Sequence, residues 1–148
     1  MNKMKTLNFS IQINAPKEKV WNVLWDDITY RKWTSTFSEG SYAVTDWEEG
    51  SKVLFLSPGG GGMFSIIAKK VSNKFMSFKH LGTVKGGEEQ PEDEETKSWS
   101  GATENYSLDD KNGGTELTVT IDITEDHESY FKETFPKALE SVKTLAEN

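Results

Sequence analysis

The chain has 148 residues, no cysteine, a formal net charge of −7 and a hydrophobic content of only 34%. The missing cysteines exclude disulfides, thiolate nucleophiles and cysteine-ligated metals. The negative charge, without any cluster of Lys and Arg, argues against nucleic acid and against anionic membrane surfaces as partners. A chain of this length can bury a core of its own, so we expect residues 1–148 to form a single domain.

The N-terminal segment predicts a half-buried strand. Four apolar residues alternate there with polar ones, which is the period-two pattern of a strand: Leu7, Phe9, Ile11 and Ile13. The segment contains no apolar run of the length that a signal peptide or a membrane span needs. We therefore expect a cytoplasmic protein that does not associate with membranes.

Two short helices are expected after this strand. Pro16 suits the first turn of a helix, where its missing N–H costs nothing, and the apolar residues that follow predict a helix to about Trp25. Asp26 and Asp27 offer capping chemistry for a second helix that runs through Tyr30 to Trp33.

From residue 41 onward the sequence reads as successive strands separated by turn residues. Short connections suit hairpins, and no crossover helix is indicated, so the strands are expected to form an antiparallel meander. The expected strands are Ser41–Val44, Lys52–Leu56, Met63–Val71, Phe75–Val84, Trp99–Leu108 and Thr115–Thr124. The acidic run from Gly86 to Glu95 interrupts them and is expected to be a solvated loop.

The last twenty-one residues, Glu128 to Asn148, predict an amphipathic helix. Its apolar residues recur at spacings of three and four and form one stripe: Phe131, Phe135, Ala138, Leu139, Val142 and Leu145. Such a stripe needs a large apolar partner, which only the strands can supply. The expected class is therefore α+β, with a curved antiparallel sheet of about seven strands wrapped around the C-terminal helix.

The sequence resembles the START-like, or SRPBCC, superfamily, whose members have the helix-grip fold. The resemblance extends from Lys5 to Ala146. Its most specific part is Asn14-Ala15-Pro16-x-x-x-Val20-Trp21-x-x-Leu24 followed by Trp33, together with a final helix that ends FPKALESVKTL. Within the superfamily the chain looks most like bacterial relatives of the C-terminal domain of the activator of the heat-shock ninety-kilodalton ATPase. The resemblance implies a hydrophobic cavity between sheet and helix, but no particular reaction.

Two motifs in the sequence have simpler explanations than a functional site. The glycines from Gly59 to Gly62 lack the Gly-Lys-Ser/Thr that completes a phosphate-binding loop, so they predict a hairpin turn. His127 and Glu128 lack the second histidine of a zinc-protease helix, and the neighbouring acids suit the positive end of the helix dipole. We expect neither a metal nor a cofactor.

One pair of polar residues could serve chemistry. In the strand MSFKH, His80 shares a face with Met76 and Phe78, and in ATENYSL, Glu104 shares a face with Tyr106. If the apolar members point inward, the imidazole and the carboxylate could meet inside a cavity, where they could orient a ligand or transfer a proton. Alternatively, they lie at the open rim and contact only solvent, because one bulge would reverse the parity.

The sequence favours a domain that binds a small apolar or amphipathic molecule, as a monomer or weak dimer. Two alternatives are a chaperone-associated interaction module, like the relatives named above, and an enzyme of the cyclase or hydrolase kind that uses His80 and Glu104. The candidate ligand-binding residues are Trp25, Trp33, Phe37, Phe55, Phe64, Phe78, His80, Trp99, Glu104, Tyr106, Phe131 and Phe135. Each aromatic residue among them could instead simply fill the core.

Overall fold

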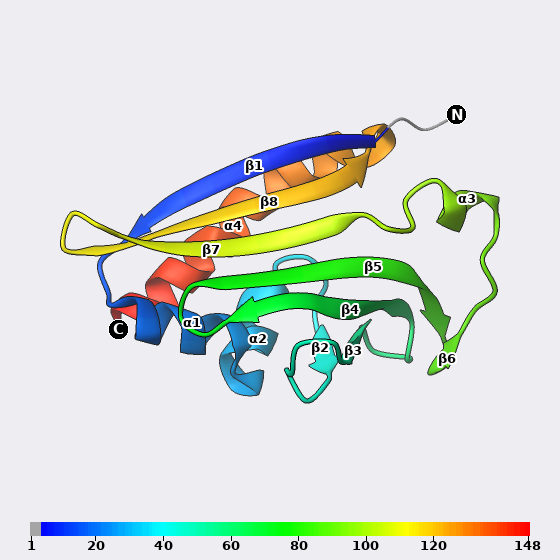
Figure 1. Cartoon of the computed structure of the whole chain (residues 1–148), viewed down its shortest axis with the longest axis horizontal. Helices are drawn as coiled ribbons and strands as arrows, with labels where there is room; N and C mark the ends of the chain where they lie inside the picture. The colour runs from blue at the N-terminus through cyan, green and yellow to red at the C-terminus, as the bar shows by residue number, and fades with distance from the viewer. Residues whose placement is uncertain (1–3) are drawn as a thin grey trace.

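An antiparallel sheet and one long helix make up most of the fold, as Figure 1 shows. The computed structural model describes residues 4–148. The strands are β1 (Met4–Ile13), β2 (Tyr42–Val44), β3 (Lys52–Leu56), β4 (Gly62–Val71), β5 (Phe75–Lys85), β6 (Glu88–Glu89), β7 (Thr103–Lys111) and β8 (Gly114–Thr124). The helices are α1 (Lys17–Trp25), α2 (Asp27–Thr34), α3 (Glu94–Lys97), the 3-10 turn η1 (Glu125–His127) and α4 (Glu128–Glu147).

The strands pair in the order β1-β8-β7-β5-β4-β3-β2, all antiparallel, and β6 pairs with β5. The first strand thus pairs with the last one, while β2 forms the opposite edge. The two short helices after β1 and the long C-terminal helix were expected. The structure confirms the α+β class and fits the helix-grip architecture.

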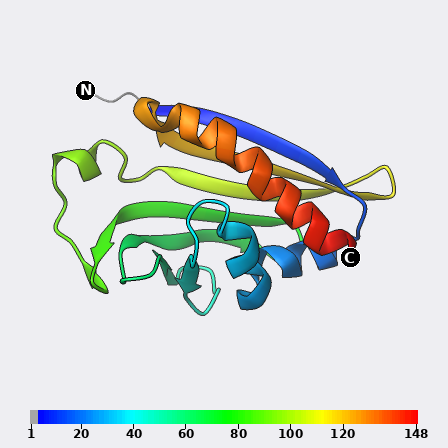
Figure 2. The same cartoon turned by 180° about the vertical axis from the view of Figure 1, so that it is seen from behind.

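Helix α4 crosses the concave face of the sheet, as seen from behind in Figure 2. Its apolar stripe is buried, and the buried residues include Phe135, Ala138, Leu139, Val142 and Ala146. Pro136 lies inside the helix, which continues on both sides of it. The first helix packs near the C-terminal end of α4, and α2 lies between α1 and the β2 edge.

The pairing of β4 with β5 contains two register shifts, between Phe64 and Ser65 and between Ile67 and Lys69. At the first shift, Phe64 pairs with Gly82 and Ser65 with His80, so one residue of β5 has no partner on β4. A bulge of this kind bends the sheet and re-aims the side chains next to it. It brings Ser65 beside His80 on the concave face.

The structure corrects two expectations about the chain between β5 and β7. The strand expected from Trp99 begins only at Thr103, because Ser98, Trp99 and Ser100 complete the turn of α3 through backbone bonds to Glu95 and Thr96. The acidic run is also not a plain loop. It contains β6 and the start of α3, whose N-cap Asp93 accepts a hydrogen bond from the Thr96 backbone N–H.

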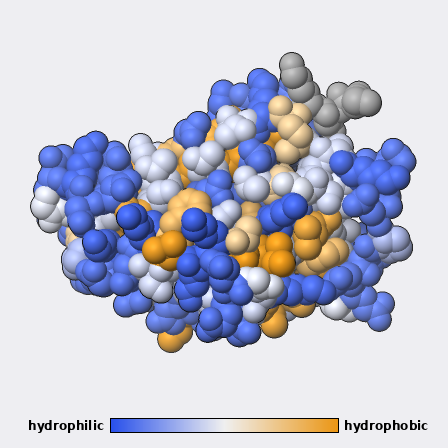
Figure 3. All heavy atoms as spheres, in the orientation of Figure 1, coloured by the Kyte–Doolittle hydropathy of each residue, from blue (hydrophilic) through white to orange (hydrophobic). Residues whose placement is uncertain are grey.

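The face of the sheet opposite α4 is turned toward the viewer in Figure 3. It is mainly hydrophilic, with hydrophobic atoms in patches between the polar ones. This matches an antiparallel sheet with one face on the core and one face in water. None of the helices described within residues 4–148 is long and apolar enough to cross a membrane.

Candidate functional site

A pocket of about 440 Å³ lies between the concave face of the sheet, the segment from α2 to β2, and the start of α4. Its volume falls within the roughly 300–1,000 Å³ that is common for small-molecule sites. Most of the lining is aromatic or aliphatic. The polar lining residues are Tyr30, Thr34, Ser38, Ser41, Tyr42, His80, Glu104, Tyr106, Asp122, Thr124, His127 and Tyr130.

The structure brings eleven of the twelve candidate residues together around this pocket. They come from α1, α2 and the loop after it, from β3, β5 and β7, from the loop before β7 and from α4. They are Trp25, Trp33, Phe37, Phe55, Phe78, His80, Trp99, Glu104, Tyr106, Phe131 and Phe135. Two of these, Phe78 and Phe135, have only 1% of their surface exposed, so they serve the core as well as the pocket wall.

Phe64 is the exception and does not line the pocket. Its neighbour Ser65 points to the concave face, and successive side chains of a strand point to opposite faces. The Phe64 ring therefore lies on the other face, where the Lys52 ammonium sits 5.6 Å from its centroid. It also covers Gly82, where an added Cβ would come within 2.5 Å of the ring.

Trp25 is the centre of the aromatic cluster. Its ring lies 5.0 Å from the centroid of Tyr106 and 5.4 Å from that of Phe78, both in edge-to-face geometry. It also contacts Trp21, Tyr30, Trp33 and Trp47. Its buried indole Nε1 has no hydrogen-bond partner among the described residues. Contacts with ring faces can partly compensate such an N–H.

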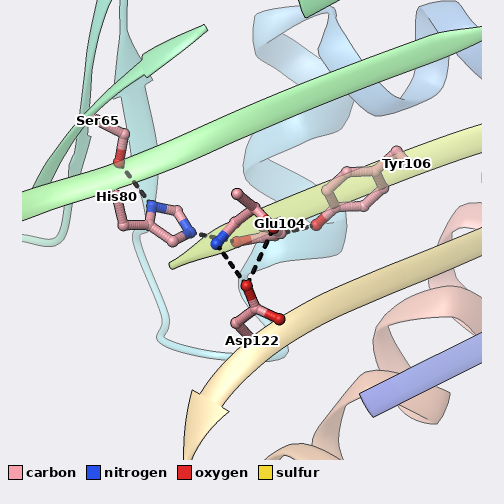
Figure 4. Close-up of polar contacts among 6 residues, drawn as sticks. Ser65, His80, Glu104, Tyr106 and Asp122 are labelled. Atoms are coloured by element: carbon pink, nitrogen blue, oxygen red, sulfur yellow. Dashed lines mark hydrogen bonds and ion pairs between the residues drawn. The ribbon is translucent and has the colours of Figure 1, made fainter. Parts of the chain in front are cut away.

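A row of four polar side chains crosses the sheet beneath the pocket, as Figure 4 shows. The Ser65 hydroxyl lies 2.7 Å from His80 Nδ1, and His80 Nε2 lies 3.0 Å from Glu104 Oε1. The Tyr106 hydroxyl donates a hydrogen bond to the other carboxylate oxygen, Glu104 Oε2. Ser65 comes from β4, His80 from β5, and Glu104 and Tyr106 from β7.

The partners of His80 fix where its proton lies. A carboxylate can only accept, so Nε2 carries the hydrogen that it donates to Glu104. Nδ1 then accepts from the Ser65 hydroxyl when the ring is neutral, or donates to it when the ring is charged. Both ring nitrogens are therefore engaged in either state. Only 6% of the His80 side chain and 18% of the Glu104 side chain are exposed.

Asp122, on β8, lies next to this row in the sheet, but its side chain alternates with the buried isoleucines on either side of it and therefore points to the other face. Its Oδ2 accepts hydrogen bonds from the backbone N–H and the hydroxyl of Thr103, both at 3.1 Å, and Oδ1 accepts one from Thr6 at 2.7 Å. Partial burial acts to raise the pKa of Asp122. The hydrogen bonds from Thr6 and Thr103, helped by the charge of His80, outweigh it and hold the pKa below its usual value.

Two phenols at the pocket stay neutral. Burial, followed by the negative charge and hydrogen bond of Glu104, raises the pKa of Tyr106 well above its ordinary value. Burial and the charge of Glu104 also raise the pKa of Tyr30. Both hydroxyls are therefore protonated at any physiological pH, and Tyr106 remains a donor to Glu104.

The start of α4 is tied to the other side of the pocket. The Tyr130 hydroxyl donates to the backbone carbonyl of Phe37 at 2.9 Å, and the Phe37 ring packs against Phe135 at 4.9 Å. His127 Nδ1 lies 2.7 Å from the Thr124 hydroxyl. The two contacts of Phe37 join the loop after α2 to α4 across the lining of the pocket.

The geometry does not form a nucleophile triad of the serine-hydrolase kind. Ser65 is completely buried and does not line the pocket, so its hydroxyl has no access to a substrate placed there. Of the polar row, His80, Glu104 and Tyr106 line the pocket, and the side chain of Glu104 is more exposed than that of His80. Within residues 4–148, no cluster of three or more His, Cys, Asp or Glu side chains could hold a metal ion.

Among the polar residues in and next to the row, sequence reasoning missed Ser65, Tyr30 and Asp122. Ser65 could not be placed, because its position beside His80 depends on the bulge in β4 and β5. Asp122 lies in the strand predicted from Thr115 to Thr124, among apolar residues of β8 that alternate with polar ones. Its position in this alternation predicts a side chain on the polar face of the strand, so no sequence pattern pointed to it.

The fold places this chain in the class of helix-grip proteins, in which a curved antiparallel sheet holds a long C-terminal helix. Comparison with protein-family profiles and with curated protein sequences gives no match. Comparison with solved structures gives many.

The solution structure of the Aha1 dimer from Colwellia psychrerythraea has 23% sequence identity and a TM-score of 0.74, covering 97% of this chain and 96% of that one. Protein MLL2253 from Mesorhizobium loti has 16% identity and a TM-score of 0.73, with 95% and 96% covered. CalU16 from Micromonospora echinospora has 15% identity and a TM-score of 0.66, with 99% and 85% covered. The likeness to Aha1 confirms, at the level of the fold, the resemblance inferred from the sequence.

Proposed function

We propose that this chain binds a small amphipathic molecule in the pocket between the sheet and α4. The proposal rests mainly on one observation: the buried row of polar side chains reaches the wall of an otherwise apolar pocket. Glu104 and His80 are almost enclosed there by aromatic side chains. A largely apolar pocket with a few convergent polar groups is typical of a site that binds the body of a ligand by burial and orients its head.

The apolar wall supplies most of the binding free energy in this proposal. Burial of a methylene group contributes about 0.8 kcal/mol, or about fourfold in the dissociation constant. The rings of Trp25, Trp33 and Phe55 offer such a surface. The polar row orients the ligand, because a head group that bonds Glu104 is held beside Tyr106 while the tail lies along the rings.

A homologous series of n-alcohols from hexanol to octanol tests the proposal. Binding can be followed by NMR through the indole signals of the five tryptophans. The signals of Trp25, Trp33 and Trp99, which line the pocket, should shift more than those of Trp21 and Trp47, which do not. Affinity should rise about fourfold per methylene until the pocket is full. Affinities independent of chain length would contradict the proposal.

A pair of matched substitutions gives the control. Met63 lines the pocket, so Met63→Trp places a larger side chain there and should weaken octanol binding about tenfold or more through overlap with the ligand. Met4, on β1, lies outside the pocket and is 37% exposed, so Met4→Trp should leave binding unchanged. Equal binding by wild type and Met63→Trp would place the alcohols elsewhere. Native mass spectrometry of protein purified from its source would then identify any retained ligand.

A second candidate function is that of a chaperone-associated interaction module, in the monomeric or weakly dimeric state. The likeness to the Aha1 dimer supports it, through the fold alone. The test measures the ATPase rate of the heat-shock ninety-kilodalton chaperone from the same source, with and without this protein. An unchanged rate, together with no complex in size-exclusion chromatography, would exclude this function.

A further inference from the structure

Apart from the two histidines, the charge that lines the pocket is negative. Glu104 lines the pocket with its carboxylate, whereas no Lys or Arg of the part of the chain that the structure describes belongs to the lining. The carboxylate of Asp122 bonds Thr6 and Thr103 on the other face of the sheet. The two histidines there, His80 and His127, are already bonded to Glu104 and Thr124 through ring nitrogens. A ligand with a carboxylate or phosphate head would therefore meet like charge without a matching cation.

The remaining hydrogen-bond capacity of the polar row is that of an acceptor. Both nitrogens of His80 are engaged, and the only O–H of Tyr106 goes to Glu104. The Glu104 carboxylate has about four lone-pair sites, of which these two neighbours use two. The row can thus accept about two further hydrogen bonds but has no donor left to give. The Tyr30 hydroxyl can turn to donate or accept, and it brings no charge.

The aromatic rings that line the pocket together with Glu104 also favour a cation. Trp25, Phe78 and Tyr106 line the same pocket as Glu104, and Tyr106 bonds its carboxylate directly. A cation within about 6 Å of a ring centroid is attracted by the negative face of the ring. The net charge of −7 adds attraction at longer range.

We infer that the ligand of this pocket has a cationic head with at least one N–H, such as an aliphatic ammonium, which donates to Glu104 while its apolar tail lies among the rings. The inference rests on the proposed binding function and specifies its ligand class. The ammonium supplies the donors that the polar row lacks and a positive charge for its carboxylate. His80 and Tyr106 hold the carboxylate in place, with one bond to each oxygen.

Three probes with the same tail test the inference at neutral pH: octylamine, 1-octanol and octanoate. Calorimetric titration of the wild-type protein should rank octylamine above octanol by about tenfold or more, as a charge-assisted hydrogen bond predicts, and octanoate below octanol. This ranking needs no variant. If octanoate binds as tightly as octylamine or more tightly, the inference is wrong.

The variant Glu104→Gln keeps the shape of the side chain and removes its charge. It should weaken octylamine about tenfold or more and change octanol less than about threefold. The matched control Glu133→Gln removes the same charge from an exposed position of α4, away from the pocket, and should change neither. Unchanged octylamine binding in folded Glu104→Gln would overturn the inference.

The outcomes separate the inference from the proposed function. If octanol also fails to bind the wild type, the proposed function itself is wrong. If octanol binds but the three head groups bind equally well, the proposed function stands and only the inferred ligand class is wrong.

Discussion

The hydrogen bond from Tyr106 to Glu104 should be worth a measurable part of the stability of the domain. Tyr106→Phe removes one hydroxyl and leaves the ring among its aromatic neighbours. A hydrogen bond to a charged group contributes roughly 1.5–3 kcal/mol. Because 18% of the Glu104 side chain is exposed to the pocket, water can partly replace the lost donor. We therefore expect Tyr106→Phe to lower the free energy of unfolding by about 1.5–2 kcal/mol, near the lower end of that range.

Urea denaturation followed by tryptophan fluorescence measures this loss. With a denaturant slope of about 2 kcal/mol per molar, the midpoint should fall by about 0.75–1 M at an unchanged slope. The control is Tyr130→Phe, which removes a hydroxyl bonded to the Phe37 carbonyl from a residue that is 45% exposed. Water replaces that bond, so its cost should stay within about 0.5 kcal/mol. Equal stability of the two variants would contradict this expectation.

Two further perturbations test the core and the charge beside the row. Phe135→Ala should cost about 3–5 kcal/mol in the same denaturation experiment, because the ring is buried, while the partly exposed Phe131→Ala should cost clearly less; equal losses would contradict this. Asp122 has a lowered pKa in the folded state, so its charge stabilises the fold above the unfolded-state value of about 3.9 and this contribution is lost as the pH falls below that value. The stability difference between wild type and Asp122→Asn should accordingly shrink between about pH 5 and pH 2, and a constant difference would refute this assignment.

Much of the architecture can be predicted from local sequence patterns. The residues of the site can be predicted only where two strands pair without a register shift. The alternation in β1, the stripe of α4 and the turns between strands each specify an element by its period. The common face of His80 and Glu104 could be inferred because β5 pairs with β7 without a register shift. Whether that face was a pocket wall or an open rim depended on how α4 and the loop after α2 cover it, which no local pattern contains.

The parts that sequence reasoning missed depend on single local events. Phe64 was expected at the site with the other rings, but it alternates with Met63 and Ser65 and so lies on the other face, while the bulge places Ser65 opposite His80. The late start of β7 follows from the N-cap of α3, where Asp93 holds the Thr96 N–H and the following residues complete the turn. A bulge or a cap changes only a few backbone bonds, yet it decides which side chain faces the pocket.

The pairing of the first strand with the last also governs the order in which the molecule can assemble. β1 forms its ladder with β8, and the hydrogen bond between Thr6 and Asp122 spans 116 positions. While the chain is being synthesised, β1 has no strand to pair with until β8 has emerged. Closing such a long loop early costs entropy that no local contact offsets. The local hairpins β4–β5 and β7–β8 can form first, so the pocket wall exists as separate pieces before β1 and α4 close the domain around it.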